Sequence, residues 1–388
     1  MKNISTALLL FAAAGMPLSA EKPVHSSGTH SEKPLFEEIT GIKKKTDKFN
    51  LFLNMHTDYR ADFTGSSFDE GKFEMKQLRI EAKGNINKWI FYRYRQRLNK
   101  GEGPDGNFDN VLQSIDIAEV GFRFGKFDVV AGRQCAAYGG IEFDINPIDI
   151  YEYSDMIGYI HNFTTGVRVA YNMNPEQQFQ FQVMNSIKTS VKSLYGDLPK
   201  SKLPLLFVLN WNGKVTDFYN TRWSVSYANQ TKGNHNLYFA LGNEFTISDR
   251  ASAYVDWMYS REGADIRGIV TDIVGMQDGH KALNAEYMST VVHFNWFVAP
   301  KWNLFVKGMY ETAGIYKSTG AVPKGRLRTS WGYMGGVEFY PLKERTLHFF
   351  LVYVGRSYKY APNSWSYGVE NYSTSRISAG LIWQIPVF

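Results

Sequence analysis

The chain has 388 residues, of which 44% are hydrophobic and 15% are aromatic. Its 43 Lys and Arg residues against 37 Asp and Glu give a formal net charge of +6, an excess too small to indicate a nucleic-acid partner. The single cysteine, Cys135, excludes an internal disulfide, and the eight histidines show no paired spacing that would indicate a metal site.

The N-terminal residues have the pattern of a secretory signal peptide. An apolar run at 7–14 follows Lys2, and a stretch of mostly small residues after it ends at Ala20, where cleavage is expected. The run is far shorter than the roughly 20 apolar residues of a transmembrane helix, and no such run occurs later in the chain. The predicted parts are a signal peptide (1–20), a periplasmic N-terminal tail (21–47) and a transmembrane β-barrel (48–388).

From residue 48 onward, apolar and polar residues alternate in segments of about 10 to 15 residues, the length of a tilted strand that spans a membrane. For example, Val120 and Phe122 alternate with Gly121 and Arg123. Sixteen such segments can be counted. They predict an all-β fold, a sixteen-stranded antiparallel transmembrane β-barrel.

The links between these segments alternate between short and long, as the two rims of an outer-membrane barrel do. A soluble β-sandwich has no reason for this regularity. The short links are expected at 84–87, 125–126, 174–176, 248–250, 299–301 and 341–344. The long links are expected at 61–71, 100–110, 136–162, 188–203, 263–281, 314–326 and 359–372. The C-terminal residues, which end at Phe388, fit a shifted form of the last strand of such a barrel.

The stretch 89–97 carries a stripe of positive charge. Because side chains alternate along a strand, Arg93, Arg95 and Arg97 share one face, which a water-filled lumen can accommodate. The alternative is a structural ladder of ion pairs, although no acid occurs between residues 88 and 100. A column of positive charge in a narrow channel attracts anions. The predicted pore-lining basic residues are Arg79, Arg93, Arg95, Arg97, Arg123, Arg168 and Arg222.

One acidic stretch has the spacing of a calcium-binding loop. Asp105, Asn107, Asp109 and Asp116 take ligand positions, but Asn110 stands where such a loop requires glycine. We interpret the stretch as a solvated hairpin tip, and we predict no metal site.

Catalytic motifs are missing from the sequence. It contains neither Gly-x-Ser-x-Gly nor His-Glu-x-x-His, so we predict no catalytic residue and no cofactor. A barrel esterase could still assemble a base from His56 or His293.

Two stretches resemble the phosphate-selective porin O and P family. Residues 73–84 resemble an early strand that ends in a glycine turn, and 116–124 with 129–134 resemble a strand pair before the third loop. The resemblance implies a sixteen-stranded trimeric porin, a third loop that folds inward as a constriction, and an arginine ladder for anions. Arg93, Arg95 and Arg97 suit that ladder by type and face.

The third long link, 136–162, contains five acids and no Lys or Arg. If it folds into the lumen, its acids are expected to face the basic wall and to create a transverse field, as in general diffusion porins. That field offsets the attraction for anions. The predicted acidic constriction residues are Glu142, Asp144, Asp149, Glu152 and Asp155.

The function that these patterns favour is passive diffusion of small hydrophilic solutes through the outer membrane of a Gram-negative bacterium, with a preference for anions such as phosphate. The expected partners are outer-membrane lipid, the solutes and two further copies in a homotrimer, without nucleic acid. The alternatives are a general diffusion porin without selectivity, a barrel-type surface adhesin or receptor, and an outer-membrane esterase.

Overall fold

The computed structural model describes residues 32–101, 109–320, 322–342 and 346–388. The predicted signal peptide and the first part of the tail lie outside the described residues, so both stay predictions. Within the described ranges, no helix is long and apolar enough to cross a membrane.

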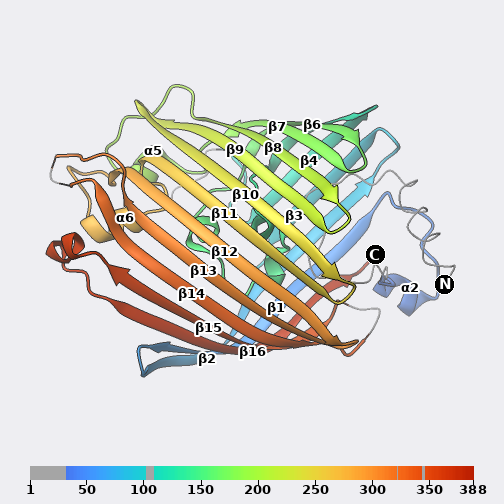
Figure 1. Ribbon diagram of the computed structural model, residues 1–388. Helices are drawn as coiled ribbons and strands as arrows, with labels where there is room; N and C mark the ends of the chain where they lie inside the picture. Colours follow the sequence, from blue (N-terminus) through green and yellow to red (C-terminus); the bar gives the residue numbers. More distant parts are fainter. Residues whose placement is uncertain (1–31, 102–108, 321, 343–345) are drawn as a thin grey trace.

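Sixteen antiparallel strands form one closed barrel, as the sequence predicts (Figure 1). The first eight strands are β1 (Asn50–Thr64), β2 (Ser67–Asn85), β3 (Ile90–Arg97), β4 (Ile115–Phe124), β5 (Phe127–Cys135), β6 (Phe163–Asn174), β7 (Gln177–Asn185) and β8 (Leu205–Thr216). The last eight are β9 (Tyr219–Thr231), β10 (Asn234–Ser248), β11 (Ala251–Ala264), β12 (Leu283–Ala299), β13 (Trp302–Ile315), β14 (Gly325–Phe339), β15 (His348–Tyr360) and β16 (Tyr372–Pro386). Each strand pairs with its neighbours in the sequence, and β1 pairs with β16 to close the barrel.

The alternation of side chains along β13 shows why these segments form a barrel wall. Leu304 and Val306 are exposed on the outside of the barrel. Phe305, which lies between them, and Lys307, which follows them, are buried on the inside. A strand turns successive side chains to opposite faces, so one face meets lipid and the other meets the interior.

Short turns join the strands at one rim, and mostly longer links join them at the other. β4 and β5 meet at 125–126, as predicted. The prediction was wrong at 61–71, where β1 and β2 continue to a two-residue turn at 65–66. β9 and β10 also meet in a two-residue turn, at 232–233. Each of these two tight turns contains a glycine with positive φ, which few other residues adopt at low cost: Gly65 and Gly233.

The helices are short, and they lie in the links and at the N-terminus. They are α2 (Leu35–Thr40), α3 (Ile141–Asp144), η1 (Pro147–Asp149), α4 (Asp155–Gly158), α5 (Val191–Tyr195), α6 (Ile269–Val274) and η2 (Pro362–Tyr367). α2 packs on the last residue of the chain, with the rings of Phe36 and Phe388 4.9 Å apart. The ring of Phe49, just before β1, lies 5.6 Å from the same Phe388 ring.

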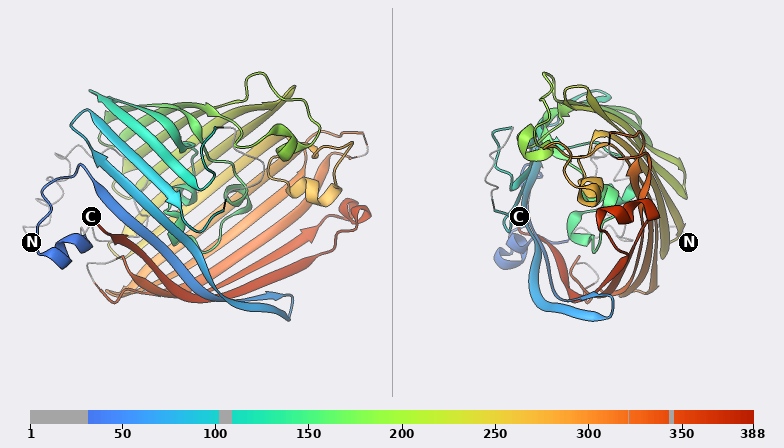
Figure 2. Two further views of the ribbon diagram at one scale, coloured as in Figure 1. Left: turned by 180° about the vertical axis from the view of Figure 1, so that it is seen from behind. Right: turned by 90° about the vertical axis from the view of Figure 1, so that its left-hand side faces the viewer.

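Segment 136–162, which connects β5 to β6, lies inside the barrel (Figure 2). It reaches distant parts of the wall. The backbone N–H of Ile141 donates to Asp256 of β11 at 2.8 Å, and Nδ1 of His56 on β1 donates to the carbonyl oxygen of Ile148 at 2.7 Å. We call this stretch the inserted segment.

The two ends of the inserted segment, which we call its neck, continue the β5–β6 pairing. The N–H of Ala136 donates to the carbonyl oxygen of Asn162 at 2.7 Å. Beyond the neck, the segment packs into an apolar cluster within the barrel. This cluster joins its side chains, among them Tyr138 and Ile145, to wall residues such as Met258. The interior is therefore a partly packed core, not an empty cylinder.

Candidate functional site

The arginines of β3 lie against the inner side of the wall. Antiparallel pairing with β2 sets Arg79 opposite Arg97 and Glu81 opposite Arg95. Nε of Arg93 donates to Oε1 of Glu81 at 3.0 Å. β3 itself has no acid, so the neighbouring strands supply the counter-charges.

Asp116 of β4 is the carboxylate around which these arginines gather. The β3–β4 register shifts between Arg95 and Gln96, and this β-bulge turns Asp116 into the interior, where it is fully buried. Its carboxylate oxygens lie 2.8 Å from Nη2 of Arg97, 3.5 Å from Nη1 of Arg79 and 3.8 Å from Nε of Arg95. One carboxylate is thus shared by three guanidiniums, a group that we call the Asp116 cluster.

The structure divides the seven predicted pore-lining arginines by exposure. Arg79, Arg95 and Arg222 are buried, with exposures of 5%, 3% and 6%, which differs from the prediction that they face solvent. Tyr153 of the inserted segment lies near Arg79 and Arg95. The half-buried members of the set are Arg93, Arg97, Arg123 and Arg168.

The acids of the inserted segment meet a different part of the wall from the one predicted. The buried carboxylate of Glu142 pairs with Nζ of Lys307 on β13. Oε2 of Glu152 lies 3.1 Å from Nη2 of Arg376 on β16. These acids therefore bind the segment to strands β13–β16 instead of facing the arginines of β3.

Asp155 is the centre of the densest of these contacts. It pairs with Arg328 of β14, and its Oδ1 lies 2.7 Å from Nη2 of Arg356 on β15. The same Nη2 lies 2.5 Å from Oε2 of Glu311, whose other oxygen accepts the backbone N–H of Asp155 at 2.5 Å. Two acids and two arginines thus hold the start of α4 against the wall.

Asp144 is an acid of the inserted segment that reaches one of the predicted arginines. Oδ1 of Asp144 lies 3.5 Å from Nη2 of Arg222 on β9. Asp149, the remaining predicted acid, lies on η1 and lines a small cavity.

The sequence prediction did not single out the basic residues that hold the inserted segment. Alternation within each strand could have placed them on the inner face, as it does for Lys307 between the outward Val306 and Gly308. Alternation within a strand could not have predicted which acids of the inserted segment pair with these basic residues. These residues are Lys307, Arg328, Arg356 and Arg376.

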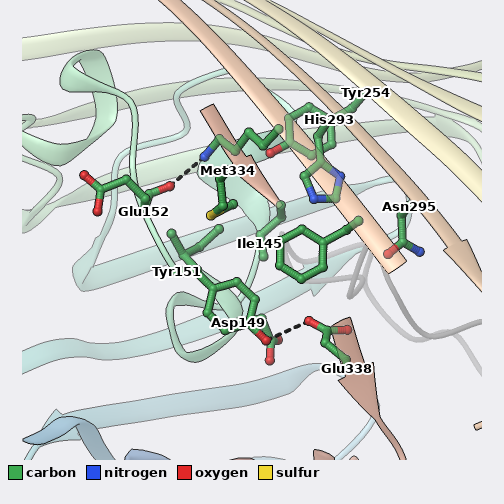
Figure 3. A pocket seen from close by; sticks show the side chains of 12 residues that line it. Ile145, Asp149, Tyr151, Glu152, Tyr254, His293, Asn295, Met334 and Glu338 are labelled. Atoms are coloured by element: carbon green, nitrogen blue, oxygen red, sulfur yellow. Dashed lines mark hydrogen bonds between the residues drawn. The ribbon is translucent and has the colours of Figure 1, made fainter. Parts of the chain in front are cut away.

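The cavity beside η1 is lined by aromatic rings (Figure 3). The ring of Tyr151 stacks on Phe305 at 5.2 Å, and its hydroxyl donates to Oε1 of Glu338 at 2.7 Å. The ring of His293 stacks between Tyr254 and Phe305. His293 and His56, the two candidate bases of an esterase, are thus packed against rings or bonded to the backbone of the inserted segment.

The described residues include no group of three His, Cys, Asp or Glu side chains placed to hold a metal ion. Of the calcium-like spacing, Asp105 and Asn107 lie outside the described residues. Asp109 pairs with Arg133 at 3.2 Å, and Asp116 is shared by arginines, so both bind cationic side chains.

Comparison with known families gives one match over nearly the whole barrel. The sequence model described as phosphate-selective porin O and P matches residues 49–385. No curated protein matches the chain.

Solved structures with a similar fold are outer-membrane channels and porins. The outer membrane channel DcaP of Acinetobacter baumannii has a TM-score of 0.61 at 11% identity, covering 87% of this chain and 96% of its own. The anion-selective porin from Comamonas acidovorans has a TM-score of 0.55 at 8% identity, with coverages of 87% and 99%. The trimer form of OmpT, an outer membrane protein of Vibrio cholerae, has a TM-score of 0.54 at 12% identity, with coverages of 87% and 100%. At these identities the likeness concerns the fold.

Proposed function

The chain belongs to the phosphate-selective porin O and P family, and from this premise we propose that its barrel passes small hydrophilic solutes with a preference for anions. The protein is an outer-membrane porin of a Gram-negative bacterium. The family assignment favours a channel over an enzyme.

The Asp116 cluster is the observation that carries the anion preference. Three guanidiniums share one carboxylate, and the side chain of Arg97 remains 24% exposed. Low-dielectric walls focus the field of such a group into the adjoining water, so an anion gains and a cation loses energy there. Arg93, Arg123 and Arg168 are half-buried on the same side of the barrel and can add to this field.

The placement of the acids in the inserted segment also supports anion preference over unselective diffusion. Glu142, Glu152 and Asp155 are paired with bases of β13–β16, so much of their charge is neutralised at the wall. These paired acids therefore reduce the attraction of the β3 arginines for anions less than unpaired acids across a constriction would.

Phosphate itself can be tested by competition. If the half-buried arginines bind phosphate more tightly than chloride, micromolar to millimolar phosphate should reduce the chloride current through single channels. An unchanged chloride current would leave a general anion preference and contradict a phosphate preference.

We also propose that the protein is a homotrimer. The family resemblance implies a trimer, and a trimer form is described for the similar OmpT. Native electrophoresis and mass spectrometry in detergent should give three times the monomer mass.

Anion preference should fall as the pH rises from 7 to 9. Lys188 lies in the long link between β7 and β8, and burial, together with the charges of Lys100, Arg97 and Arg133, lowers its pKa to about 8. Above that pH its ammonium is mostly neutral, so the link between β7 and β8 loses one positive charge. Reversal potentials across this pH range measure the change, and the Lys188→Met variant should lack it. A variant with the same pH response as the parent would contradict this assignment.

The same group predicts the sign of a stability change. The pKa of Lys188 is lowered in the folded state from 10.5, so between pH 8 and 10.5 the unfolded chain binds more protons. The contribution of this residue to stability therefore rises with pH in that window.

A further inference from the structure

The outward side chains of β13, β14 and β15 change in kind from one rim to the other. These strands run side by side in the wall (Figure 1). Toward the rim of short turns their outer face is aliphatic, with Leu304, Val306 and Leu351 41%, 57% and 52% exposed. Aromatic rings follow further along the strands, where Trp331 and Tyr353 are 38% and 41% exposed. At the ends that meet the long links, the outer face becomes basic.

Two cations lie on a pair of rings at this basic end. The rings of Tyr310 on β13 and Trp331 on β14 are 5.8 Å apart. Nη1 of Arg326, near the start of β14, donates to the hydroxyl oxygen of Tyr310 at 3.5 Å. Nζ of Lys359, near the end of β15, lies 5.2 Å from the centroid of the Trp331 ring. We call these four residues the outer basic site.

The positive charge of the outer basic site is not neutralised by the protein. Both cationic side chains are exposed, and neither has an acidic partner within the part of the chain that the structure describes. The acids of β13 and β14, Glu311 and Glu338, are buried on the inner face. By contrast, Arg261 on the outer face of β11 pairs with Glu286 at 3.2 Å. The outer basic site is thus open to an anion from outside the protein.

The height of the outer basic site places it at the border of the apolar core of the bilayer. A tilted strand gains about 2.4 Å along the barrel axis per residue, and the apolar belt of such a barrel is about 25 Å tall. Lys359 comes ten residues after Phe349, an outward ring at the start of β15, which corresponds to about 24 Å. Arg326 comes thirteen residues before Phe339, at the other end of β14, which corresponds to about 31 Å. Both cations therefore lie at the level where the headgroups of the outer leaflet begin.

We propose that the outer basic site binds the phosphate groups of the glycolipid that forms the outer leaflet of this membrane. A guanidinium presents paired N–H donors that match phosphate oxygens, and an ammonium adds a further charge-assisted bond. The rings and the aliphatic surface below the two cations suit the acyl chains of the same molecule. A free phosphate ion would contact the cations alone, so the combination of charge and apolar surface favours a lipid. The site lies on the outside of the wall, separate from the channel.

Titration of the delipidated protein with diphosphoryl lipid A in nonionic detergent, followed by native mass spectrometry, tests this site. Arg326→Gln/Lys359→Gln should weaken the apparent affinity at least tenfold. The matched control is Lys88→Gln/Lys126→Gln at the opposite rim, where Nζ of Lys88 lies 5.0 Å from the centroid of the Trp89 ring. This control should bind lipid A as the parent does. Single-channel conductance equal to that of the parent shows that both variant barrels are folded.

Further probes separate a lipid phosphate from other ligands. Phosphatidylcholine, whose phosphate is balanced by its own ammonium, should bind to the parent and to Arg326→Gln/Lys359→Gln alike. In the unmodified protein, lipid A binding should weaken as salt is raised, because screening acts on exposed charges. Equal affinity of the parent and the variant for lipid A, or binding that is independent of salt, would overturn the proposal. Displacement of lipid A by an equimolar amount of inorganic phosphate would assign the site to a free anion and would also overturn it.

Discussion

Removal of the inserted segment is expected to raise single-channel conductance at least about twofold, because a wall of sixteen strands encloses an aqueous channel when nothing fills it. The neck bond between Ala136 and Asn162 allows residues 139–159 to be replaced by a short Gly-Ser turn without disturbing the β5–β6 pairing. Planar-bilayer recording of the parent and the shortened protein measures the effect.

A point variant tests the anchoring of the segment more finely. Lys307→Met leaves the buried carboxylate of Glu142 without its ammonium partner, a change that costs about 3–5 kcal/mol in typical buried pairs. The segment should loosen and the current should become noisier and larger. The matched double variant Glu142→Gln/Lys307→Met removes both charges at similar volume, and it should behave more like the parent. Equal conductance in the parent, the point variant and the shortened protein would show that the segment does not restrict the channel.

Replacement of Arg93, Arg95 and Arg97 by Ala should shift selectivity toward cations by about threefold or more in permeability ratio at low salt. The change removes three positive charges and leaves Glu81 and Asp116 without these partners, so both effects have the same sign. Focused fields in a narrow channel make a few charges decisive. The Debye length is about 10 Å at 0.1 M salt and shortens at higher salt, so the shift should fade as ionic strength rises.

A matched pair of single changes separates channel exposure from support. Arg97 and Arg95 lie on one strand and share Asp116, but their side chains are 24% and 4% exposed. Arg97→Gln should therefore shift the reversal potential more, and Arg95→Gln should lower thermal stability more. A reversal potential that stays constant in the triple variant would show that these arginines do not act on permeating ions.

Changes to the acids should act in the opposite direction. Asp144, Asp149 and Glu152 replaced by amides should shift permeability toward anions. Arg376, which pairs with Glu152, and Arg222, which pairs with Asp144, would then lose neutralising partners.

Strand number and most turns could be predicted from the sequence because alternation and link length are local properties. The turn at 125–126 follows from two alternating segments that leave only Gly125 and Lys126 between them. The link at 61–71 was wrongly predicted as a loop for an equally local reason. Residues 67–73 of β2 are exposed on both faces of the strand, so this part of the hairpin contains more polar residues than a wall segment.

The arrangement of the charges could not be predicted in the same way. A bulge turns Asp116 inward, and sequence alternation gives no sign of it. The partner of Glu142 is Lys307, more than 160 residues later in the chain. Alternation places both charges inside the barrel, but only the path of the inserted segment brings them together.

The reversal potential of the unmodified protein in a KCl gradient tests the central claim most directly. With purified protein in a planar bilayer, tenfold more KCl on one side and low total salt, the zero-current potential should have the sign of chloride permeating faster than potassium. It should move toward zero as both concentrations are raised at a constant ratio. A potential of zero at low salt, or one with the sign of potassium permeating faster, would contradict an anion-preferring porin.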